Sequence, residues 1–171
     1  MGFSETYFFR DIEAVEEKHR RRMPAKPRSV KLDEAKQDLK YVETQHQGML
    51  RDLAEASKLL ESVPAELVEH LTVNNSRWKE MIGDDTSSLW RISSTKRHQM
   101  DRLHKQGAKA IEGDIERWAA EKMAAAEAAV AQAESLPVVE AEEKAWNEWS
   151  TGFSEEIEEM HDEYDRRGQW G

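Results

Sequence analysis

The chain has 171 residues, of which 35% are charged and 38% hydrophobic, and it carries a net charge of −10 and no cysteine. The lack of cysteine excludes disulfides, thiolate metal sites and a cysteine nucleophile. No apolar run approaches the roughly 20 residues that cross a bilayer, and the acidic balance argues against general nucleic-acid binding. With no recognisable cleavable signal, we expect an intracellular protein, cytoplasmic or organellar, for example mitochondrial.

Residues 1–31 are predicted to form an amphipathic helix followed by a basic, proline-containing arm. Apolar side chains recur at helical spacing until Pro24 and Pro27, which cannot continue the helix. Phe3, Tyr7 and Phe8 give this segment more aromatic surface than one short helix buries by itself. We therefore interpret it as a docking segment.

The arm itself, residues 18–31, contains seven Lys or Arg and no acidic residue. Three interpretations stay open: a solvated linker, an arm that lies on an acidic protein or on RNA, and a patch that meets a membrane surface. No aromatic residue is interleaved among the cations, so base stacking is not supported. Arg20, Arg21 and Arg22 are the predicted partner contacts.

The strongest periodic signal lies in residues 32–63, where small or apolar side chains follow an unbroken heptad pattern. The positions are Leu32, Ala35, Leu39, Val42, His46, Met49, Leu53, Ala56, Leu60 and Val63. This pattern predicts a helix about 48 Å long that packs against other helices. Within it, His46 is interpreted as a hydrogen-bonded or register-setting histidine.

The flanking positions of this seam indicate which kind of partner it has. In a parallel homodimer Asp38 would face Glu43, and an antiparallel pair would also oppose acidic groups, so self-pairing is poorly designed. Leu50 and Leu59 widen the apolar stripe beyond a two-helix seam. We expect Leu39, Leu50, Leu53 and Leu59 to contact different helices, of this chain or of a partner.

Three further helices are predicted, at about residues 64–82, 88–135 and 138–167. Pro64 begins the first of them, and Gly83 is the residue expected to end it. The second is weakened by Gly107 and Gly113 and contains an alanine-rich stretch at residues 119–133. Pro137 separates it from the last helix.

The last predicted helix has an aromatic stripe on one face and dense Glu and Asp on the other. The stripe consists of Trp146, Trp149, Phe153, Ile157, Met160 and Tyr164. Residues 1–31 carry a net charge of +3 and residues 135–171 a net charge of −8. Tryptophan is enriched at interface anchors, so Trp146, Trp149 and Phe153 are predicted to bind a partner.

Metal-ligand spacing occurs three times as Glu-x-x-His, at Glu16–His19, Glu43–His46 and Glu158–His161. Two such motifs, with one glutamate from each of two further helices, form the di-iron sites of helical bundles. Glu66 or Glu69 and Glu112 or Glu116 are the nominal candidates for those glutamates. Because glutamate is abundant and only His46 lies on a clear core face, we expect surface spacings that hold no metal. No catalytic residue and no cofactor are expected.

These patterns predict an all-α protein, an extended helical bundle with coiled-coil-like long helices, divided into residues 1–31 and residues 32–171. The predicted function is a non-catalytic, structural subunit of a larger protein complex that braces or bridges other subunits in a hetero-oligomer. Neither a small-molecule substrate nor nucleic acid is expected. The alternatives are a di-iron helical-bundle enzyme and a peripheral membrane adaptor that uses the basic head.

Overall fold

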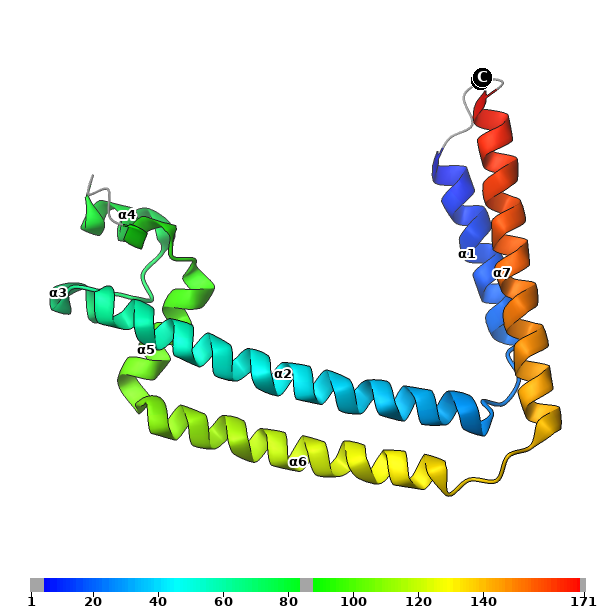
Figure 1. Cartoon of the computed structure of the whole chain (residues 1–171). Helices are drawn as coiled ribbons and strands as arrows, with labels where there is room; N and C mark the ends of the chain where they lie inside the picture. The colour runs from blue at the N-terminus through cyan, green and yellow to red at the C-terminus, as the bar shows by residue number, and fades with distance from the viewer. Residues whose placement is uncertain (1–4, 84–87, 170–171) are drawn as a thin grey trace. The chain divides into compact units, whose positions relative to one another are not determined.

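A computed structural model describes residues 5–83 and 88–169, and within these ranges the chain is all-α, as predicted (Figure 1). No strand is formed by the described residues. The helices are α1 (Glu5–Arg21), α2 (Arg28–Ser62), α3 (Ala65–Val68), α4 (Asn75–Ile82), the 3-10 helix η1 (Ser88–Arg91), α5 (Ser94–Gln106), α6 (Ala108–Glu134) and α7 (Glu140–Gln169).

The two long helices with the strongest patterns have nearly the predicted bounds. The heptad segment 32–63 becomes α2, which starts one turn earlier because the carbonyl of the buried Pro27 accepts from the Lys31 N–H at 3.1 Å. The aromatic segment 138–167 becomes α7. Hydrophobic periodicity therefore locates the helices that present one continuous apolar face.

The two middle segments, by contrast, are each broken into shorter helices. Residues 64–82 form α3 and α4, and the Asn74 side chain caps α4 by accepting from the Arg77 N–H at 2.9 Å. Gly83 ends α4 at φ +69°, which confirms the expected stop. Residues 88–135 form η1, α5 and α6, and the break before α6 is at Gly107, which has φ +87°.

Contacts group the chain into two compact units. The first comprises residues 1–35 and 130–171, and the second comprises Lys36–Ala129. The sequence predicts two consecutive segments that meet at residue 31, whereas the contacts place residues from both ends of the sequence in one unit. The first unit contains α1 and α7, and the second contains most of α2 and α6 with the short helices that connect them.

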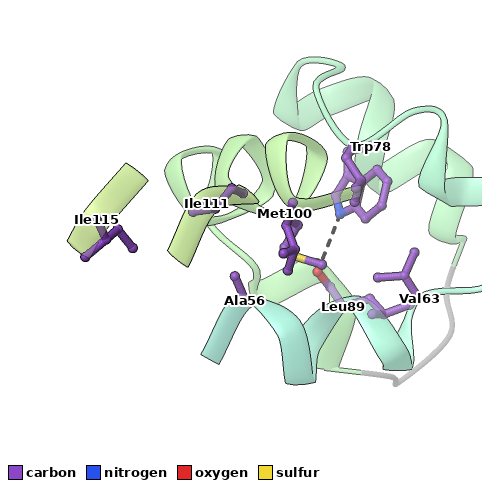
Figure 2. Packing of buried hydrophobic residues seen from close by; sticks show 9 residues of the cluster. Ala56, Val63, Trp78, Leu89, Met100, Ile111 and Ile115 are labelled. Atoms are coloured by element: carbon purple, nitrogen blue, oxygen red, sulfur yellow. Dashed lines mark hydrogen bonds between the residues drawn. The ribbon is translucent and has the colours of Figure 1, made fainter. Parts of the chain in front are cut away.

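The core of the second unit lies where the short helices meet α2 and α6 (Figure 2). Its buried members are Ala56, Val63, Leu71, Trp78, Leu89, Met100, Leu103, Ile111 and Ile115. Trp78 is 1% exposed, and its indole N–H donates to the Leu89 carbonyl at 3.4 Å, which ties α4 to η1. A buried indole requires such a partner.

Arg97 of α5 is a charged residue that is fully buried beside this core. Its guanidinium donates to the carbonyls of Leu71 and Val73, at 2.8 and 2.7 Å, and to the Asn75 side chain. It also lies 5.1 Å from the centre of the Trp78 ring. Burial lowers the pKa of Arg97. Within the described residues no carboxylate pairs with this guanidinium, so backbone carbonyls and a ring face compensate its charge.

We predict that Arg97→Met lowers the free energy of unfolding by about 3 kcal/mol or more, because three acceptors lose their donor at one time. The matched control is Arg91→Met, which removes an exposed guanidinium lying 4.9 Å from the Trp90 ring centre. Its effect should stay within about 0.5 kcal/mol. Urea titrations followed by circular dichroism measure the free energy of unfolding of both variants. Equal losses of stability would contradict the stabilising role of the buried Arg97 contacts.

Candidate partner-binding surfaces

The heptad seam of α2 is largely covered, but only a few of its positions are fully buried. Of its ten positions Ala35, Ala56 and Val63 are buried, and the other seven are half-buried. The predicted contact residues Leu39, Leu50, Leu53 and Leu59 all belong to the half-buried class, and the last three pack against the core cluster. The large side chains of the seam therefore keep apolar surface in contact with solvent.

Within the second unit, α2 lies beside α6 (Figure 1), and His46 joins the two helices. Its Nε2 lies 3.0 Å from Oε1 of Glu116, and the histidine side chain is 26% exposed. The predicted hydrogen-bonded histidine is therefore present, although at a half-buried seam position. Its partner is a glutamate on another helix and not Glu43 of the Glu-x-x-His pair.

The aromatic stripe of α7 packs against α1 in the first unit, where the two helices run side by side (Figure 1). The Trp149 indole N–H donates to the His19 carbonyl at 2.9 Å. Its ring lies 4.9 Å from that of Trp146 and is stacked 6.4 Å from that of Phe153. The imidazole of His19 meets Phe153 edge-on at 5.0 Å. The stripe thus holds α1 to α7, and its predicted anchors remain half-buried.

The predicted basic contacts are exposed at the end of α1. Arg20 and Arg21 each lie 3.4 Å from Glu17 of the same helix, and Arg22 is also exposed. Exposed ion pairs of this kind contribute little to stability, so these cations are available to a partner. Phe3 lies outside the described residues. Tyr7 and Phe8 belong to α1, but their side chains lie outside the described part, so the aromatic docking segment stays a prediction.

Two carboxylates hold α7 in the first unit. Glu143 accepts from the Ser29 N–H at 3.0 Å and from the Ser29 hydroxyl, and these bonds lower the pKa of its carboxyl group. Glu156 is hydrogen-bonded to His19, which lowers its pKa, and the nearby Lys18 adds to the effect. Both pKa values are lower because the charged form of each carboxylate accepts the bonds.

Several histidines are hydrogen-bonded to a carboxylate from a different part of the chain. Among them are His19 with Glu156, His46 with Glu116, and His104, which lies 3.3 Å from Glu69. Within residues 5–83 and 88–169, no group of three or more potential ligands is close enough to hold a metal ion. The glutamates of the Glu-x-x-His pairs, Glu16, Glu43 and Glu158, are exposed.

Two features were missed by the sequence analysis. Trp90 is 48% exposed and Tyr41 is 64% exposed, so each presents an aromatic ring to solvent. A pocket of about 350 Å³ also opens between α2, α5 and α6. Its apolar lining is Met49, Leu53, Ala56, Ile111, Ile115 and Trp118. These residues repeat at helical spacing, but periodicity cannot tell a fully packed face from one that borders a pocket.

No family model, no curated protein and no protein of known structure matches this chain. In the described part of the chain, no helix combines the length and the apolar character needed to span a membrane.

The lowered carboxylate pKa values predict an acid-sensitive first unit. A carboxyl group with a lowered folded-state pKa stabilises the fold above its ordinary value of 4.5, and this contribution is lost as the pH falls through the folded-state pKa. The melting temperature should therefore fall on acidification below about pH 4.5. The fall should be smaller in the Glu143→Gln and Glu156→Gln variants than in the unmodified protein. The control is Glu155→Gln, at an exposed neighbour. The indole N–H signal of Trp149 reports the same change locally, and identical pH profiles in all variants would contradict this role.

We also predict that the purified protein binds iron or zinc in far less than stoichiometric amounts, because the imidazole of His46 is held by one carboxylate only. Elemental analysis measures the metal content. One metal ion per chain that is lost in His46→Ala would overturn this prediction and favour a metal enzyme.

Proposed function

We propose that this protein is a non-catalytic helical subunit of a larger multi-protein complex, where it braces or bridges neighbouring subunits. The observation that carries the proposal is the incomplete burial of the α2 seam, seven of whose ten positions are half-buried. Apolar surface that a chain leaves open along a regular helix is typical of interaction sites.

The distribution of burial supports this proposal further. The largest side chains that are fully buried are Trp78, Arg97, Leu71, Met100 and Pro27, and none of them belongs to the seam. Only Ala35, Ala56 and Val63 of the seam are buried, so its leucines keep an edge of apolar surface that a partner helix could contact.

The charges beside the seam favour a different protein as the partner. Asp38 and Glu43 flank the seam and are exposed, so two copies of α2 would bring acidic groups together. A partner helix with basic flanking positions avoids this repulsion. The exposed Arg20, Arg21 and Arg22 give the same chain a second surface of opposite charge, which suits a protein that contacts two neighbours. An intracellular location, cytoplasmic or organellar, is part of the proposal.

We predict that the isolated protein is helical by circular dichroism, binds a hydrophobic dye, and self-associates or unfolds with low cooperativity. A purified native partner should restore a sharp transition, because it covers the seam. Leu39→Glu should reduce self-association in analytical ultracentrifugation. Gln37→Glu is the matched control, since it adds the same charge at an exposed position of α2.

A monodisperse monomer with a cooperative melt and no dye binding would show that the chain closes its own core. The proposed role as an assembly subunit would then lose its support.

A further inference from the structure

The pocket between α2, α5 and α6 has the dimensions and lining of a small-molecule site. Its volume of about 350 Å³ lies within the range of ligand pockets in proteins. Ala56, Ile111 and Ile115 are buried in its lining, at 1%, 8% and 8% exposure. All of the lining residues belong to the second unit, so the pocket is formed within one compact body.

Two of the lining residues favour a planar aromatic ligand. Trp118 of α6 and Met49 of α2 are both half-buried and both line the pocket. An indole ring offers a face for offset stacking, and a thioether makes favourable contacts with the edge of an aromatic ring. A flat ring in contact with both would gain stacking and sulfur–aromatic contacts that a branched aliphatic group could not make.

Gln99 of α5 is a polar residue in the lining of this mainly apolar pocket. It lines the pocket, and its Oε1 atom is buried without a hydrogen-bond donor among the described residues. A buried acceptor that lacks a donor carries a free-energy cost, which a ligand N–H would remove once the side-chain amide turns its covered Oε1 atom toward the pocket.

The charged residues at the rim favour a neutral ligand. Asp114 lies 3.6 Å from Arg102 and 3.4 Å from Arg117, and Asp52 lies 3.8 Å from Lys96. The carboxylates of Asp114 and Asp52 at the rim are therefore already paired with cations. A charged ligand would lose its hydration in the apolar interior without gaining an unopposed counter-charge.

We propose that this pocket binds a neutral, planar aromatic group with one N–H donor, of the indole class, with its ring between Trp118 and Met49 and its N–H on Gln99. This site does not depend on the proposed role in assembly. The same indole group can come from a free small molecule or from a tryptophan side chain of another protein.

The test compares indole with benzothiophene, which has nearly the same shape but no N–H. Methyl-labelled methionine reports binding by NMR, because Met49 is the methionine that lines the pocket among the described residues. Indole should shift the Met49 signal with a dissociation constant of about 1 mM or lower. Benzothiophene should bind roughly fivefold to tenfold more weakly.

Gln99→Leu should abolish the difference between the two probes, since it removes the acceptor and retains an apolar wall. Gln47→Leu makes the same substitution at an exposed position of α2 and should leave the difference unchanged. The proposal is overturned if indole does not shift Met49, if the wild-type protein binds both probes equally, or if Gln99→Leu still prefers indole.

A third probe, N-acetyl-tryptophan amide, distinguishes the two sources of the indole group. Binding at least as tight as that of indole assigns the pocket to a tryptophan of a partner protein, because the peptide groups then fit at the rim. Weaker binding assigns it to a free small molecule.

Discussion

The buried guanidinium of Arg97 links α5 to the irregular segment between α3 and α4 and to the core residue Trp78 of α4. α3 has only four residues, and the segment that follows it reaches α4 without a regular backbone ladder. Arg97 supplies donors to the carbonyls of Leu71 and Val73 in that segment. Its guanidinium also lies over Trp78, so one side chain fixes both the turn and the central aromatic residue of the core. An apolar residue of similar length could fill the space but could not satisfy these carbonyls.

The same core explains why two seam residues at the end of the heptad segment are buried. Near the short helices, Ala56 and Val63 are buried because α3, α4 and α5 add neighbours to α6. The larger seam residues are half-buried both near the start of α2, at Leu39 and Val42, and near its end, at Leu53 and Leu60. One neighbouring helix covers a narrow apolar stripe of α2. A stripe widened by Leu50 and Leu59 requires more than one neighbouring helix to cover it. The pocket lined by Leu53 and Ala56 lies toward the end of α2.

Sequence analysis predicted the elements whose signal is local. The heptads of residues 32–63 and the aromatic stripe beginning at Trp146 each located a helix, because an apolar face repeats along one segment. The all-α fold followed from the same patterns. The breaks in residues 64–82 and 88–135 were not predicted, because the Asn74 cap and the turn at Gly107 interrupt patterns that otherwise read as continuous. Arg97 gave no signal at all, since its acceptors lie more than 20 residues away in the sequence. The partner role of the half-buried leucines stays a prediction, because a sequence does not tell which neighbour covers a face.

The pairing of α1 with α7 has a consequence for synthesis on the ribosome. The contacts of His19 with Trp149 and Glu156 join residues 130 and 137 positions apart. At typical rates of translation, α1 emerges on the order of ten seconds before the helix that covers it. During this interval the first helix has no aromatic stripe to pack against, while the contacts within Lys36–Ala129 can already form. The order of synthesis therefore allows the second unit to fold before α1 can pack against α7.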